Sequence, residues 1–146
     1  MAAREDDYVR CLAGNLRAAS RMITREYDTA LRPHGLRITQ VAILVQLAQL
    51  QPVTVTEFAH AISGERSAVA RDLAILERDG LVASAAKAGD QRSRHLSLTP
   101  AGKRRLAACA PAWRAVQDRI SELLGARDAA ALVALSGRVV SALETR

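Results

Sequence analysis

Apolar residues recur every three or four positions between residues 8 and 31, which predicts one long amphipathic helix. Its other faces carry several arginines. We expect the helix to end at RPHG, residues 32–35, because proline cannot continue a helix and glycine tolerates the turn that follows.

A second helix is expected to begin at Thr39, whose side chain can cap free backbone amides, with Ile38 and Ile43 packed together as a hydrophobic staple. The body of this helix, VAILVQLAQL, is apolar on nearly every side and is therefore predicted to be buried. Pro52 is expected to end it.

Two short helices separated by a glycine turn come next. Thr54 and Glu57 have the spacing of a capping box, and Val53 and Phe58 are placed for the accompanying staple, so a helix is predicted from there to about Ile62. The turn is assigned to SGE at 63–65, and a further helix to Arg66 through Asp79, ended by Gly80.

The apolar period then changes from helical to alternating. LVASAAK and RHLSLT are predicted strands of a hairpin around the loop AGDQRS. Thr99 and Pro100 predict the start of a long helix that reaches about Leu124, and a last helix carries one apolar stripe. The predicted fold is mainly α with a small β-hairpin, a winged helix-turn-helix over about residues 36–99 within a single domain of residues 1–146.

The helix from Arg66 to Asp79 has two different faces. Val69, Leu73 and Leu76 fall together and are predicted to face the core, whereas the opposite side carries the polar and small residues Ser67, Arg71, Ala74 and Arg78, with Arg66 near the N-terminal end. A helix fits the major groove of DNA, where arginine and serine can bond to base edges or phosphates. The alternative is a solvated face whose arginines pair with neighbouring acids.

Charge favours a polyanionic partner. Among 146 residues, 21 lysines and arginines against 15 acids give a net charge of +6 and a pI near 10.3, which suggests nucleic acid or an anionic membrane. No apolar run is long enough to span a membrane, and the N-terminus does not resemble a secretory signal, so a cytoplasmic protein without membrane attachment is expected.

The hairpin concentrates part of this charge. Asp90 precedes Arg92 by two residues and Arg94 by four. An arginine at a hairpin tip suits the narrow, electronegative minor groove, with Asp90 as a brace for one guanidinium. A plain solvated hairpin is the alternative.

These segments resemble the MarR family of bacterial transcriptional regulators. CLAGNLRAASRMITREYD resembles the family's first helix, LRPHGLRITQVAILVQLA its second, VTVTEFAHAISGERSAVARDLAILERDGLV its helix-turn-helix, and GDQRSRHLSLTPAGKRRL its wing and following helix. The resemblance implies a homodimer joined through terminal helices, about residues 5–35 and 100–146, that binds a pseudo-palindromic DNA operator. It assigns the major groove to Arg66, Ser67, Ala68 and Arg71, and the minor groove to Arg92 with help from Arg94.

Many members of that family are repressors released by small aromatic acids bound between the dimer helices and the DNA-binding lobe, so a small aromatic or anionic effector is implied. Its site is not identified by sequence, although Arg17, Arg21 and His34 are cations that can bind a carboxylate. An alternative is a thiol-based redox-sensing regulator that uses Cys11. A disulfide between Cys11 and Cys109 of a second subunit is a further interpretation, and so are two thiols with a purely structural role.

Two other classes of function fit the sequence less well. The three histidines are scattered and no catalytic or phosphate-binding motif is present, so an enzyme is not expected, and no cofactor or metal site is indicated. A winged helix used as a protein-interaction module predicts an apolar or acidic recognition face, whereas this one is basic.

Overall fold

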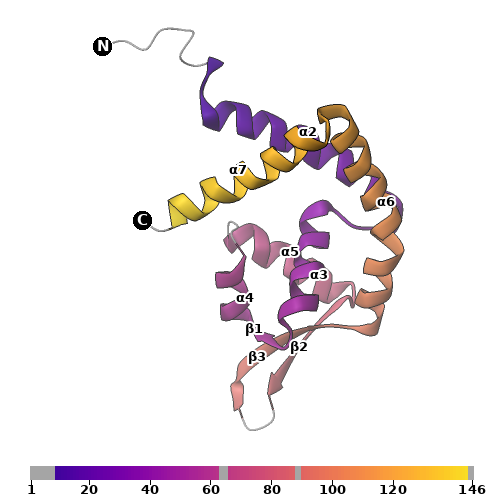
Figure 1. Cartoon of the computed structure of the whole chain (residues 1–146). Coiled ribbons are helices and arrows are strands. Elements are labelled where there is room, and N and C mark those ends of the chain that lie inside the picture. Colours follow the sequence, from indigo (N-terminus) through magenta and orange to yellow (C-terminus); the bar gives the residue numbers. More distant parts are fainter. Residues whose placement is uncertain (1–8, 63–65, 88–89, 145–146) are drawn as a thin grey trace.

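The computed structural model describes residues 9–62, 66–87 and 90–144, apart from the side chains at 66, 87 and 90–93. Its elements follow the predicted order (Figure 1). They are α2 (Leu12–Leu31), the short 3-10 helix η1 (Arg32–His34), α3 (Ile38–Leu50), β1 (Val53–Thr54), α4 (Val55–Ala61), α5 (Arg66–Arg78), β2 (Val82–Lys87), β3 (Asp90–Leu98), α6 (Pro100–Leu124) and α7 (Ala126–Glu144).

The start of α3 differs from the prediction. Thr39 lies inside the helix and does not cap it. Instead, the Gln40 side chain accepts the Arg37 N–H at 3.0 Å, and Asp28 from the end of α2 accepts the Ile38 N–H at 2.8 Å. The predicted cap was wrong because a carboxylate ten residues upstream folds back onto this helix end, which local spacing does not reveal.

The capping box at the start of α4 is confirmed. The Glu57 N–H donates to Thr54 Oγ1 at 3.1 Å, and the Thr54 N–H donates to Glu57 Oε2 at 2.8 Å. Val53 and Phe58 are both buried, as the predicted staple requires. The turn predicted at 63–65 lies outside the described residues.

A three-stranded antiparallel sheet replaces the simple hairpin. Its strand order is β1-β3-β2, with Val53 opposite Leu96 and Val82 opposite Leu98. β1 was missed because two residues carry no periodicity and exist as a strand only through pairing with β3. The loop predicted at 88–93 was also wrong in part, because β3 already begins at Asp90. The pairing of β2 with β3 is irregular there, with a register shift between Ala86 and Lys87.

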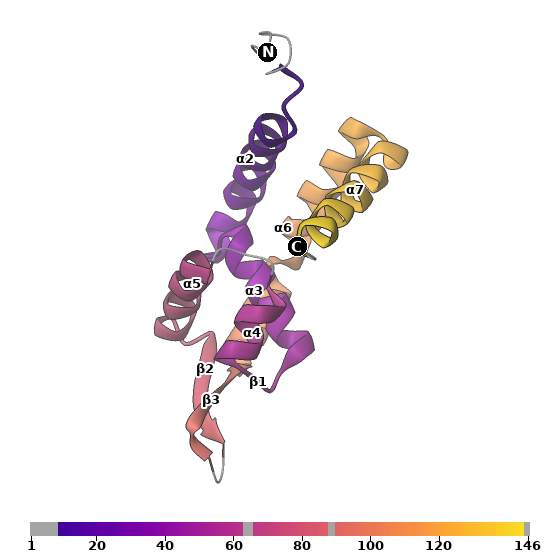
Figure 2. The same cartoon turned by 90° about the vertical axis from the view of Figure 1, so that its left-hand side faces the viewer.

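Helices α2 and α7 lie away from the sheet (Figures 1 and 2). In both views α2 and α7 occupy one end of the molecule, and the β2–β3 hairpin projects from the other (Figures 1 and 2). Thr99 caps α6 by accepting the Gly102 N–H at 3.0 Å, as predicted. Among the helices that the structure describes, none combines the length and apolar character needed to cross a membrane.

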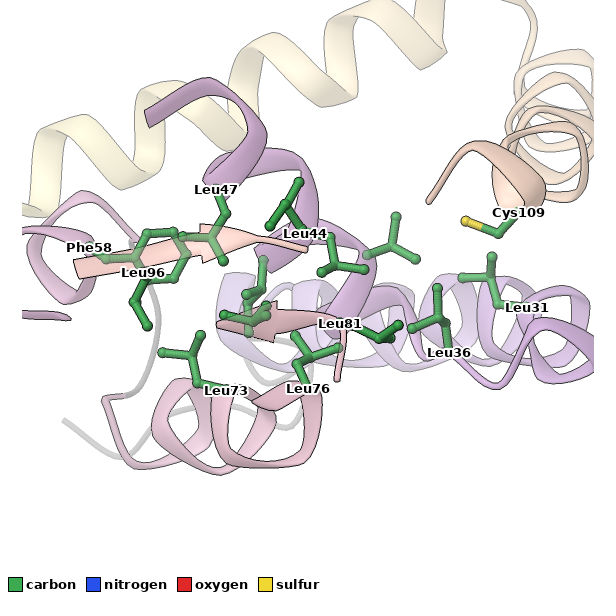
Figure 3. Packing of buried hydrophobic residues seen from close by; sticks show 14 of the residues in the cluster. Leu31, Leu36, Leu44, Leu47, Phe58, Leu73, Leu76, Leu81, Leu96 and Cys109 are labelled. Carbon is green, nitrogen blue, oxygen red and sulfur yellow. The ribbon is translucent and has the colours of Figure 1, made fainter. Parts of the chain in front are cut away.

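One hydrophobic core joins the helices to the sheet. Leu44 and Leu47 from α3, Phe58 from α4, Leu76 from α5 and Leu96 from β3 converge in it (Figure 3), and each is no more than 1% exposed. Burial of this apolar surface is the main force that fixes α5 against the rest of the lobe. The core therefore holds α5 by one face and leaves its other face outward.

Candidate nucleic-acid interface

Helix α5 presents the two faces that its sequence predicts. Leu73 and Leu76 are 7% and 1% exposed and point into the core (Figure 3). Val69 is partly buried and packs against the same core. The outward face is formed by exposed residues, namely Ser67, Arg71, Ala74 and Arg78, and Ala68 lies half-buried next to them. Arg66 begins the helix, but its side chain lies outside the described part of the chain.

The neighbouring elements fix the direction of α5. At its C-terminal end Gly80 adopts a φ of +70°, a left-handed conformation that glycine allows without steric cost, and the Leu81 N–H returns to the Leu76 carbonyl at 2.9 Å. The Thr99 hydroxyl then donates to the Gly80 carbonyl at 2.7 Å. Helix α5, the start of β2 and the start of α6 are thus joined in one rigid corner.

Among the arginines of α5, Arg78 has an acidic partner. Its Nε lies 3.0 Å from Asp79 Oδ1, in an exposed ion pair. This is the pairing with a neighbouring acid that the solvated-face alternative anticipates, and it reduces the capacity of Arg78 for other partners. Arg71 lies exposed near the middle of the same face and remains the stronger candidate for contact with a ligand.

The hairpin is braced by Arg94. Its Nε donates to Ser84 Oγ at 2.7 Å and its Nη2 donates to the Ser84 carbonyl at 3.2 Å, so this guanidinium ties β3 to β2. Arg92 lies two residues earlier, within β3 and toward the tip. Its side chain and that of the predicted brace Asp90 lie outside the described residues.

The capping box places the Glu57 carboxylate at the start of α4. Hydrogen bonds from the backbone and hydroxyl of Thr54 stabilise the Glu57 carboxylate and lower its pKa, with a smaller contribution from the nearby His95. The Nδ1 atom of His95 is buried and has no hydrogen-bond partner within the described part of the chain. These groups lie at the junction of β1, β3 and α4, where Glu57 is exposed and His95 is half-buried.

An apolar cavity of about 840 Å³ opens between α3 and α6. The apolar pattern of α3 did not indicate this cavity, because it predicted burial on nearly every side. That prediction was wrong for Ala42, Val45 and Ala48, which are exposed and line the cavity. Trp113 and Lys103 from α6 also line it. None of the three cations named from the sequence, Arg17, Arg21 and His34, is part of the lining.

The two cysteines occupy different environments. Cys11 is exposed immediately before α2, and Cys109 is buried in α6 where it lines the apolar cavity. Burial raises the pKa of the Cys109 thiol and disfavours the reactive thiolate. This environment weighs against Cys109 as a ready partner for a disulfide with Cys11.

Known proteins provide the context for this architecture. A sequence model of a protein family, described as "MarR family", matches residues 36–93, which span α3 to the first part of β3. The chain has no match among curated protein sequences.

Solved structures match almost the full chain. The M. tuberculosis transcriptional regulator MosR in complex with DNA is 31% identical, with a TM-score of 0.72 over 93% of this chain and 99% of that one. Another crystal structure of MosR is 32% identical, with a TM-score of 0.71 over 88% of this chain and 96% of that one. The transcriptional repressor CouR, bound to a 23-mer DNA duplex, has the same fold at 24% identity, with a TM-score of 0.84 over 95% of this chain and 99% of that one.

The family model coincides with the lobe that carries α5 and the hairpin, and the MosR matches extend over the terminal helices as well. The members are regulators of transcription rather than enzymes. With its winged helix and terminal helices, the chain belongs to the MarR family of transcriptional regulators.

Proposed function

We propose that the protein is a homodimeric repressor that reads a pseudo-palindromic operator in duplex DNA and is released from it by a small molecule. The observation that carries the proposal is the outward face of α5, where Ser67 and Arg71 are exposed on the side opposite the buried leucines. A rigid helix with such a face can enter the major groove and bond to base edges. The base-reading role falls on Arg66, Ser67, Ala68 and Arg71.

The hairpin supplies the second point of contact. Arg92 is proposed to enter the minor groove, and Arg94, bonded to Ser84, stiffens the hairpin that carries it. Asp90 remains the proposed brace for a guanidinium at the tip. The complex of MosR with DNA, at 31% identity, supports DNA as the partner of this chain.

Homodimerisation is supported by apolar surface at one end of the molecule. Leu12 on α2 is 76% exposed, Leu123 at the end of α6 is 80% exposed, and Val133 and Leu143 on α7 are 70% and 64% exposed. Helix α7 has no buried residue within the chain. A second copy that packs on α2 and α7 by two-fold symmetry covers these side chains and sets two α5 helices at a fixed spacing for an operator.

Release by an effector is supported by the cavity between α3 and α6. Its apolar walls suit a flat hydrophobic molecule, Trp113 offers an aromatic face, and the Lys103 ammonium can pair with an anionic group. The cavity adjoins Leu98, the last residue of β3, and an occupant there contacts both the terminal helices and the DNA-binding lobe. The effector is therefore proposed to be a small aromatic or anionic compound.

Selection of bound duplexes from a random DNA pool at near-physiological salt tests the DNA-binding proposal. Enrichment of a two-fold symmetric site, with half-sites about one helical turn apart, is the expected result. Binding without any enriched sequence contradicts operator reading. Absence of binding favours the protein-interaction alternative.

A further inference from the structure

A second hollow, of about 1010 Å³, lies beside the recognition helix α5. One wall is α5 itself, through Ala68, Arg71 and Arg78. The other wall is the segment that joins α2 to α3, through Arg32 and Arg37. Figure 2 shows the ribbon of α5 near the lower end of α2, and residues of both elements line the hollow. Nothing in the sequence indicated that this joining segment faces α5.

The lining of this hollow carries a small excess of positive charge. Its lining contains four arginines and three aspartates. Asp28 is occupied as the acceptor for the Ile38 N–H at 2.8 Å, and Asp79 is paired with Arg78 at 3.0 Å. Asp72, which is half-buried in α5, is the third acid. Arg32, Arg37 and Arg71 are all exposed, so their charge is presented toward solvent.

The basic surface continues along α2. A neighbouring hollow of about 720 Å³ shares Arg32 and Asp28 with the first, and adds Arg21 and Arg25. Together the two hollows contain six arginines and three aspartates, which leaves an excess of three positive charges. The positive surface therefore reaches from the recognition helix to the outer side of α2.

Thr39 lies on the same rim. It is exposed and lines the hollow, and the caps of α3 come from Gln40 and Asp28 rather than from its hydroxyl. A threonine hydroxyl can donate a hydrogen bond to a phosphate oxygen, and arginine is the side chain best suited to phosphate geometry. The residue types on this wall thus match the chemistry of a sugar–phosphate strand.

We propose that the hollow between α5 and the α2–α3 segment holds the phosphate backbone that borders the major groove, with Arg32, Arg37 and Thr39 as phosphate contacts. The inference rests on the proposed function, because α5 must lie in the groove for a backbone to occupy this position. A helix in the major groove has a phosphate ridge on each side. The wall of Arg32 and Arg37 stands beside α5 and does not form part of its outward face, which places it against a ridge rather than against base edges.

The test is the salt dependence of DNA binding by full-length Arg37→Gln and Arg32→Gln variants. The probes are an operator recovered by selection and a duplex of unrelated sequence. Arg114→Gln is the matched control, since Arg114 is an exposed arginine of α6 that lines neither hollow. Glutamine keeps the polar side chain and removes the charge, and circular dichroism verifies that each variant is folded.

Each variant is expected to lower the slope of log K against log salt by about 0.9 for every phosphate that is no longer neutralised, or roughly two for a dimer bound through two subunits. Affinity for both duplexes is expected to fall by the same factor, because bonds to phosphate carry no sequence information. A slope that equals that of the Arg114→Gln control overturns the phosphate contact while leaving DNA binding intact. An effect confined to the operator also overturns it, since that result belongs to a base contact. Failure of the unaltered protein to bind either duplex refutes the proposed function itself.

Discussion

Gly102 allows the first turn of α6 to approach the start of β2 so closely that no other residue fits. A Cβ added to Gly102 would lie 2.1 Å from the Leu81 carbonyl oxygen and 3.1 Å from Leu98 Cδ2. The nearer atom belongs to the backbone and cannot rotate away. Substitution of Gly102 by alanine therefore forces α6 and β2 apart.

The cost follows from the bonds and packing at this corner. Restoring an ordinary separation of 3.4 Å requires a shift of about 1.3 Å, the difference between 3.4 and 2.1 Å. Such a shift disrupts the bonds that Thr99 makes to the Leu81 carbonyl, at 3.1 and 3.2 Å, and to the Gly80 carbonyl, at 2.7 Å. At about 1 kcal/mol for each bond, offset by about 1 kcal/mol of helix propensity and increased by poorer packing, the free energy of unfolding falls by roughly 2–4 kcal/mol.

Urea unfolding at a fixed protein concentration measures this change, with two other glycines as matched controls. Gly80→Ala meets no atom within 4 Å but must hold a φ of +70°, and is expected to cost about 1 kcal/mol. Gly137→Ala, inside α7 with no atom within 4 Å, is expected to be neutral or to stabilise by up to about 1 kcal/mol. If Gly102→Ala is no more destabilising than Gly80→Ala, the close approach is not as described.

Three further outcomes are expected. Hydrogen bonds with Thr54 lower the pKa of the Glu57 carboxyl. The Glu57 carboxylate therefore stabilises the fold at pH values above its ordinary pKa of 4.5, and this stabilisation is lost as the pH falls through the lowered pKa. Acid unfolding should thus be less steep for Glu57→Gln than for the unaltered chain, and equal profiles would contradict the assignment. Leu135→Asp on the exposed stripe of α7 should shift sedimentation from dimer to monomer, whereas a dimer that persists would refute packing through α7. Titration with a thiol reagent should modify Cys11 rapidly and Cys109 only on unfolding, because Cys109 is buried; rapid reaction of both would contradict this difference.

Local signals were sufficient to predict most elements of the fold. The capping box of Thr54 and Glu57, the cap at Thr99 and the two-sided pattern of α5 are set by residues within four positions of one another, and the structure confirms them. The outward placement of Ser67 and Arg71 follows from the same period.

Features that depend on distant partners were not predictable. The cap of α3 uses Asp28, and β1 exists through pairing with Leu96 and His95. Neither pairing leaves a local trace in the sequence. The hollow lined by Arg32 and Arg37 and the apolar cavity likewise depend on how α2, α3, α5 and α6 pack against one another. Sequence patterns identify the faces of helices, whereas the spaces between those faces are set by tertiary packing.

Arg71 provides the most direct test of the central claim that the outward face of α5 reads DNA sequence. The measurement is the ratio of affinities for a selected operator and an unrelated duplex, compared between the unaltered protein, Arg71→Gln and the control Arg114→Gln. We predict that Arg71→Gln lowers this ratio by roughly 10- to 100-fold, equivalent to about 1–3 kcal/mol of base discrimination, and that the control leaves it unchanged. A ratio that is the same in all three proteins would contradict base reading by this face of α5.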